Sequence, residues 1–135
     1  MQDSIFTKII NGEIHCHKIY EDEKTFAFLD IHPIQPGQVL VVPKVQVGNF
    51  YELNDTDYNA FFNTVKKVAK KLRQEFPQKL KIGLMIEGLE VEHVHAKLFP
   101  IDNGTEYRTE PDMTAEPNHE ELAKMAEILK ISEVN

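Results

Sequence analysis

An apolar stripe at helical spacing in the middle of the chain most constrains the fold. Between Leu53 and Phe76, apolar residues recur at steps of three or four, at Phe61, Val65, Val68, Leu72 and Phe76. Residues at these steps share one face of an α-helix, so the segment is predicted to be one long helix that buries this face. Asn54, Asp55 or Thr56 can cap its start.

Short runs of β-branched and aromatic residues on both sides of this helix predict strands. The expected strands are residues 17–22, 24–31, 38–44, 80–86 and 89–101, and a second helix is expected over 117–131. The segments 32–37 and 102–116 are expected to be loops. This order predicts a single domain over 1–135 with an α+β fold, in which a mainly antiparallel sheet carries one long helix and a C-terminal helix.

Composition excludes several classes of protein. The chain has 135 residues and a net charge of -7, which argues against a protein that binds the phosphate backbone of nucleic acid. Cys16 is the one cysteine, so an internal disulfide is impossible. The sequence has neither a signal-peptide pattern at its start nor an apolar run near the roughly 20 residues of a membrane helix. We therefore expect a cytoplasmic protein without a membrane partner.

Two histidines and a lysine alternate in the run "EHVHAKLFP", which reads as a strand. Alternate residues of a strand share a face, so His93, His95 and Lys97 are predicted to point the same way, with about 6–7 Å between successive members of the row. One interpretation is a pair of surface or half-buried histidines without a catalytic role. The other is a phosphate site, because a neutral imidazole is a competent nucleophile near neutral pH. Lys97 would then disfavour protonation of His95 and attract the phosphate.

A metal site is the remaining alternative, and it rests on the run of His15, Cys16 and His17. These three residue types are zinc ligands. In a strand, however, Cys16 would lie on the face opposite both histidines, and no second pair has zinc-like spacing.

Three segments together resemble the histidine triad (HIT) family: "SIFTKIINGEI", "IYEDEKTFAFLDIHPIQPGQVLVVPK" and "GLEVEHVHAKLFP". The resemblance runs from about residue 3 to residue 101. Members are nucleotide-binding hydrolases and transferases that act on nucleoside phosphoramidates, nucleotidyl adducts or dinucleoside polyphosphates. The family motif, three histidines alternating with apolar residues, corresponds here to the segment from His93 to Phe99.

The resemblance implies a role for each matching residue, with an AMP-like purine nucleotide as ligand. His95 would attack the α-phosphate and carry a nucleotidyl intermediate, while His93 would support and orient it. Asp30 would accept the ribose hydroxyls, a suitable task for a carboxylate. The base would lie in an apolar cleft formed by Ile5, Phe6, Ile9, Phe28 and Ile31. Gly88, which precedes the motif, would be a further nucleotide-binding residue.

Three polar positions depart from the family pattern. Lys97 replaces the third histidine, Gln38 stands where a histidine commonly follows the Pro-Gly turn, and Leu89 replaces a glutamine that helps to hold phosphate. Lys97 could serve as a phosphate cation or leaving-group acid, and Gln38 could hydrogen-bond a phosphate oxygen, whereas Leu89 cannot. The leading hypothesis is therefore a nucleotide hydrolase with His95, His93, Lys97 and Gln38 as catalytic residues. The alternatives are a nucleotide-binding module with weakened catalysis and a protein-interaction scaffold of the same fold.

Two further expectations follow from the resemblance. Many members hold a structural zinc at four positions that correspond here to Ser4, Thr7, Gln46 and His93, and only His93 could be a ligand. We therefore predict no zinc and no other cofactor. The family also implies a homodimer that pairs through the long helix and the sheet.

Overall fold

The computed structural model describes residues 2–132 and contains one five-stranded sheet with the strand order β1-β2-β3-β5-β4. All neighbouring strands are antiparallel. The strands are β1 (Lys18–Glu21), β2 (Thr25–Leu29), β3 (Val39–Pro43), β4 (Lys81–Met85) and β5 (Ala96–Ile101). The helices are α1 (Ile5–Ile10), the 3-10 turn η1 (Phe50–Glu52), α2 (Asp55–Glu75), α3 (Gly104–Tyr107) and α4 (His119–Leu129). The predicted α+β fold, with its long helix and C-terminal helix, is confirmed.

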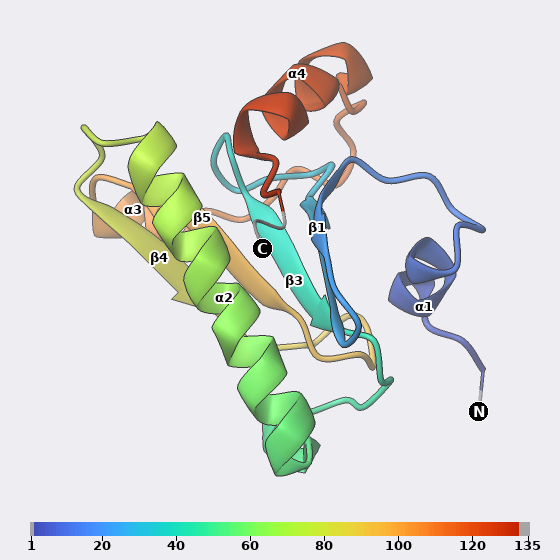
Figure 1. Ribbon diagram of the computed structural model, residues 1–135. Coiled ribbons are helices and arrows are strands. Elements are labelled where there is room, and N and C mark those ends of the chain that lie inside the picture. Colours follow the sequence, from blue (N-terminus) through green and yellow to red (C-terminus); the bar gives the residue numbers. More distant parts are fainter. Residues whose placement is uncertain (1, 133–135) are drawn as a thin grey trace.

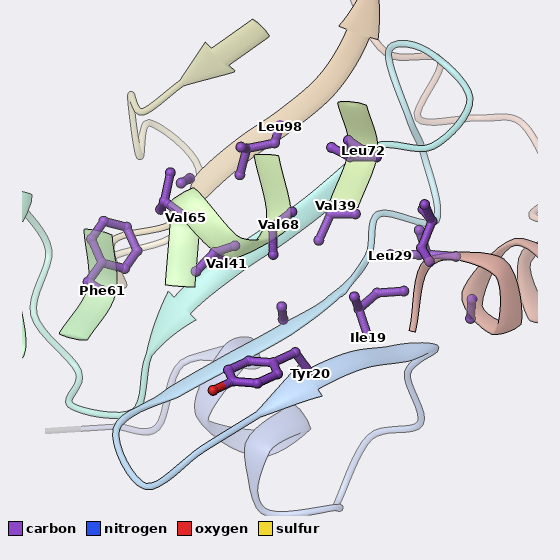
Figure 2. Packing of buried hydrophobic residues seen from close by; sticks show 14 of the residues in the cluster. Ile19, Tyr20, Leu29, Val39, Val41, Phe61, Val65, Val68, Leu72 and Leu98 are labelled. Atoms are coloured by element: carbon purple, nitrogen blue, oxygen red, sulfur yellow. The ribbon is translucent and has the colours of Figure 1, made fainter. Parts of the chain in front are cut away.

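The predicted stripe is the buried face of α2, which runs along one face of the sheet (Figure 1). Asn54 caps this helix, because its side-chain oxygen accepts a hydrogen bond of 2.8 Å from the backbone N–H of Asp57. The main core lies between α2 and the strands, and Figure 2 shows its packing. Its labelled members include Phe61, Val65, Val68 and Leu72 from α2 and Val39, Val41 and Leu98 from the sheet.

A second, smaller core covers the other face of the sheet. Successive side chains of a strand point to opposite faces, so the strand residues that alternate with the main core lie here. The cluster consists of Phe6 and Ile9 from α1, Phe26 and Phe28 from β2, and Leu40 and Val42 from β3. The helix α1 therefore packs on the face that α2 leaves open. We call this second face the site face.

The strand predicted over 89–101 begins only at Ala96, so that part of the prediction is wrong. A neighbouring strand is present, because β3 continues to Pro43, but the backbone before Ala96 does not pair with it. Pairing of β5 with β3 starts at Ala96, opposite Val41, and pairing with β4 starts at Lys97, opposite Met85. His93 and His95 consequently lie in irregular backbone just before β5, where Val94 N–H donates to the Val47 carbonyl over 2.7 Å.

The segment 102–116, expected to be a loop, contains the short helix α3, which Asn103 caps through a hydrogen bond of 2.9 Å from Glu106 N–H. The other predicted elements differ from the observed ones only at their ends. Among residues 2–132, none of the helices has the length and apolar character needed to cross a membrane.

Candidate active site

His93 is fully buried, and its surroundings fix its tautomer. Its Nε2 lies 2.7 Å from the Pro43 carbonyl oxygen at the end of β3. A carbonyl oxygen only accepts, so Nε2 carries the hydrogen and Nδ1 is the acceptor of the neutral ring. The Ser4 hydroxyl, 2.7 Å from Nδ1, is then the donor. Burial lowers the pKa of His93, and the hydrogen bond to Pro43 opposes this shift. The net lowering of the pKa favours the neutral ring.

Ser4, Thr7, Gln46 and His93 form one hydrogen-bonded cluster, which we call the His93 clasp. Ser4 also caps α1, since its Oγ accepts from Thr7 N–H over 3.0 Å. The Gln46 Oε1 accepts from Ser4 N–H over 2.8 Å and from the Thr7 hydroxyl over 2.7 Å. The clasp therefore ties the first turn of α1 to the segment after β3 and to His93.

The four side chains of the clasp occupy the positions at which the resemblance implied a zinc site, and they do not fit zinc. Zinc prefers thiolate, imidazole and carboxylate ligands, whereas Ser4, Thr7 and Gln46 offer two hydroxyls and an amide. These groups already hydrogen-bond one another and His93. Across residues 2–132, no group of three or more His, Cys, Asp or Glu side chains could hold a metal ion.

His95 is 5% exposed and is oriented by the backbone of His93. Its Nδ1 lies 2.9 Å from the His93 carbonyl oxygen, so Nδ1 is the donor and Nε2 keeps a free lone pair. The ring of Phe6 packs against it edge to face, with the ring centroids 4.8 Å apart. Burial lowers the pKa of His95, and the nearby charge of Lys97 lowers it further. The imidazole is therefore poised as a neutral nucleophile.

Lys97 lies on the site face, because it pairs with Leu40 of β3 across the sheet. Its Nζ forms an ion pair of 3.2 Å with Glu87, and the two side chains are 17% and 30% exposed. Burial alone would raise the pKa of Glu87, but the hydrogen bond and charge of Lys97 make the net shift downward. Sequence reasoning missed Glu87. The β4–β5 connection brings it to Lys97, and no spacing in the sequence reveals that contact.

Asp30 directly follows β2 and Gln38 directly precedes β3, so the two residues meet where the connecting loop joins these strands. Gln38 is 1% exposed, and its Nε2 donates to Asp30 Oδ2 over 2.9 Å. The Gln38 Oε1 accepts from Ile34 N–H over 2.7 Å, and the Asp30 Oδ1 accepts from His32 N–H over 2.8 Å. Burial raises the pKa of Asp30, although the His32 hydrogen bond and the charge of Lys97 oppose the shift. Gln38 thus directs its amide to Asp30 and to the loop.

The residues predicted to bind the base divide into a buried and an exposed group. Phe6, Ile9 and Phe28 are buried together in the second core, and of these Phe6 packs directly against His95. Ile5 and Ile31 are 48% and 40% exposed. Gly88 lies in the β4–β5 connection with a φ of 62°, a left-handed conformation that suits glycine.

The histidines near the start of the chain lie outside this site. His17 Nε2 is 2.9 Å from His119 Nδ1 of α4, and the His15 ring packs on His17. Cys16 instead packs against the second core. Cys16 therefore lies apart from the two histidines, and among residues 2–132 the run "HCH" does not supply a three-ligand metal site.

Removing the Ser4 hydroxyl tests the clasp. Ser4→Ala leaves the buried Nδ1 of His93 without its donor and α1 without its cap, so we expect the free energy of unfolding to fall by about 1–3 kcal/mol. Ser4→Thr keeps a hydroxyl and is the control, with a loss of under about 1 kcal/mol. Urea unfolding followed by circular dichroism measures both. Equal stabilities of Ser4→Ala and wild type would contradict the clasp.

Comparison with known proteins agrees with the fold and the motif. A family model described as the HIT domain matches residues 11–104. Protein hit of Bacillus subtilis is 39% identical over 106 residues, covering 73% of this chain and 71% of that protein. Adenosine 5'-monophosphoramidase hnt1 of Schizosaccharomyces pombe is 37% identical over 99 residues, covering 73% of this chain and 74% of that protein.

Solved structures of HIT-family proteins have the same fold as this chain. The crystal structure of a HIT-like protein involved in cell-cycle regulation from Bartonella henselae superimposes with a TM-score of 0.82 at 28% identity. The match covers 95% of this chain and 94% of that one. The long matched region, the shared fold and the His93–His95 motif on the site face together lead to one conclusion: this chain belongs to the HIT-domain family.

Proposed function

We propose that this protein cleaves a nucleoside phosphoramidate or a nucleotidyl phosphoanhydride through a nucleotidyl intermediate on His95 and releases a nucleoside monophosphate. The observation that carries the proposal is the orientation of His95. Its Nδ1–H is engaged by the His93 carbonyl, so the unprotonated Nε2 is the atom available to attack phosphorus. Yeast relatives that are adenosine 5'-monophosphoramidases, including those from Schizosaccharomyces pombe and Saccharomyces cerevisiae, support this reaction class.

In the first step, the Nε2 lone pair of His95 forms a bond to the α-phosphorus. The bond from phosphorus to the leaving nitrogen or oxygen breaks, and its electron pair stays with the leaving group. Lys97 donates a proton to that group and becomes a neutral amine. The Nδ1–H of His95 remains on the His93 carbonyl, which favours the positive charge that the ring acquires.

In the second step, a water oxygen bonds to phosphorus, and the bond from phosphorus to Nε2 breaks. The electron pair returns to Nε2, and Lys97 accepts the proton from water, which restores the starting state. Glu87 holds the Lys97 ammonium at 3.2 Å in the resting site, so it orients this proton donor. In the proposal, Asp30 accepts the ribose hydroxyls and Gly88 lies beside the phosphate. The base of an AMP-like purine nucleotide contacts Ile5, Phe6, Ile9, Phe28 and Ile31.

A nucleotide-binding module with weak turnover is the second candidate. It is favoured by the internal use of the variant groups: Lys97 is paired with Glu87, and the Gln38 amide is engaged by Asp30 and Ile34. Leu89 is 83% exposed and offers a phosphate no hydrogen bond. This candidate predicts saturable binding of AMP without a covalent adduct.

The proposal includes a cytoplasmic homodimer that pairs through α2 and the sheet. Supporting it, β4 is an edge strand whose Leu84 is 40% exposed, and an edge strand carries unpaired backbone groups that another chain can bind. The net charge of -7 fits a small nucleotide ligand better than a nucleic acid.

Replacing His95 separates the two candidates. Wild-type protein mixed with adenosine 5′-phosphoramidate should release AMP, and mass spectrometry after rapid quenching should detect the nucleotidyl adduct. His95→Ala should form no adduct and lower the rate by at least about 10³-fold, because the nucleophile is absent. His15→Ala, the same change at an exposed histidine, is the control. AMP binding by calorimetry without AMP release by wild type would favour the binding module.

Replacing Lys97 tests whether the variant residue is a working group. Lys97→Met keeps the length of the side chain and removes its charge and proton, so kcat should fall by about 10²–10³-fold. Lys97→His should also stay below wild type, because an imidazole does not reach Glu87 as the longer lysine does. Lys81→Met on β4 is the control at an exposed lysine. A sharp increase in turnover for Lys97→His would mean that lysine weakens this site.

The pH dependence follows from the lowered pKa of His95. Protonation of Nε2 removes the nucleophile, so the rate of adduct formation falls as the pH drops through that pKa. Because burial holds the pKa of His95 below the ordinary value of 6.5, the acid limb of the single-turnover rate should have its midpoint below 6.5. Rapid-quench rates with adenosine 5′-phosphoramidate across the acid range measure it. A midpoint above 6.5 would contradict a buried, neutral nucleophile.

A further inference from the structure

We infer that Gln38 sets the preference of the site for ribose over 2′-deoxyribose by holding the carboxylate of Asp30. This inference rests on the proposed function, in which Asp30 accepts the two ribose hydroxyls. Gln38 is a positioning residue here, because it acts on the sugar through Asp30. The inference replaces the direct contact with phosphate that the sequence suggested for Gln38.

The amide of Gln38 has only one possible orientation. Ile34 N–H can only donate, so the atom of the amide that faces it at 2.7 Å is the oxygen. The ionised carboxylate of Asp30 can only accept, so the atom that faces it at 2.9 Å is the Nε2 amino group. Both contacts require the same orientation of the amide. The side chain is 1% exposed, so hydrogen bonds fix both its oxygen and its nitrogen in a buried position.

This arrangement leaves Asp30 with a matched pair of free acceptor positions. Oδ1 receives His32 N–H at 2.8 Å, and Oδ2 receives Gln38 Nε2 at 2.9 Å. Each carboxylate oxygen has two lone pairs, so one acceptor position remains on each. Two vicinal hydroxyls provide two donors, whereas a 2′-deoxyribose provides one. A carboxylate fixed at both oxygens can therefore distinguish the two sugars by one charged hydrogen bond.

Asp30 needs this restraint because open space lies beside it. A cavity of about 300 Å³ is lined by Asp30 and Gln38, by the loop between them, and by residues of the 112–118 segment and α4. Without the Gln38 amino group, the carboxylate keeps only its bond to His32 and can turn toward this cavity. Burial also raises the pKa of Asp30, and loss of a donor to the charged form would disfavour that form further.

The register of the sheet separates Gln38 from the reacting phosphate. Val41 faces Ala96, the residue after His95, and Leu40 faces Lys97. Gln38, which directly precedes β3, is two residues from the level of Lys97 and three from the level of Ala96, about 6–7 Å and 10 Å of extended chain. It lies level with Asp30, whose N–H donates to the Gln38 carbonyl over 3.1 Å. Gln38 therefore belongs to the sugar end of the site, while Lys97 belongs to the phosphate end.

The test compares two substrates, adenosine 5′-phosphoramidate and its 2′-deoxy analogue, by their ratio of kcat/KM. In wild type the ribose substrate should be favoured by about 10–100-fold, the value of one charged hydrogen bond. Gln38→Met keeps the size of the side chain and removes its donor, so the ratio should fall to within about threefold of unity. The change should come from a higher KM for the ribose substrate, with the deoxy substrate nearly unaffected. Gln35→Met, in the same loop, is the matched control and should keep the wild-type ratio.

A second variant distinguishes loss of the sugar preference from a general loss of folding. Asp30→Asn should also abolish the sugar preference, and adding Gln38→Met to it should change the ratio no further, because Gln38 acts through Asp30. An unchanged ratio in Gln38→Met would overturn the inference. So would an equal loss of kcat with both substrates, which would assign Gln38 to the phosphate.

The inference and the proposed function fail in different ways. If wild type releases no AMP, the hydrolase proposal fails, and the sugar preference is then read from binding of AMP and 2′-deoxy-AMP by calorimetry. Tighter AMP binding in wild type that is lost in Gln38→Met would uphold the role of Gln38. Equal binding of both nucleotides by wild type would overturn it.

Discussion

The hydrogen bond from His93 Nε2 to the Pro43 carbonyl is the contact on which the geometry of this site depends. The segment that carries His93 and His95 precedes β5 and is not paired in the sheet. Its position comes instead from the 2.7 Å bond to the end of β3 and from the 2.7 Å contact with Ser4 on α1. His95 takes its orientation from the carbonyl of His93, so the clasp that holds the first histidine also aims the second.

Apart from the exposed Leu89, the residues that depart from the usual HIT pattern each have a polar partner. Lys97 is paired with Glu87, and Gln38 is bonded to Asp30. Ser4, Thr7 and Gln46 bond to one another and to His93 where thiolates and a further imidazole would hold zinc. Among the described side chains, no buried nitrogen or oxygen lacks a partner. Such complete satisfaction is costly to lose, because removal of one partner leaves a buried polar group unpaired.

Much of the fold could be predicted because it follows local rules. The stripe from Phe61 to Leu72 has helical spacing, and the dense apolar run of β3 is typical of a central strand. The start of β5 could not be predicted, because Leu89 to His95 has the composition of a strand, whereas its backbone bonds outside the sheet, as Val94 N–H does to the Val47 carbonyl. Glu87 was missed for a related reason: its contact with Lys97 depends on how the β4–β5 connection folds back, which is a tertiary property.

The resemblance located His93, His95 and Asp30, but only the register of the sheet gives these residues an order in space. The polar groups of the site face follow one another along the strands. His95 comes directly before Ala96, and Ala96 lies opposite Val41. Lys97 lies opposite Leu40, and Gln38 and Asp30 lie at the next level. Two residues of a strand advance by about 6–7 Å, so in the proposed function phosphate chemistry and sugar recognition occupy neighbouring levels of one sheet. A nucleotide lying along this direction would present its phosphate and its ribose in the same order. The antiparallel pairing of β2, β3 and β5 therefore sets the distance between His95 and Asp30, the proposed nucleophile and ribose acceptor. In that proposal, a change at the level of Lys97, such as lysine for histidine, need not disturb sugar recognition.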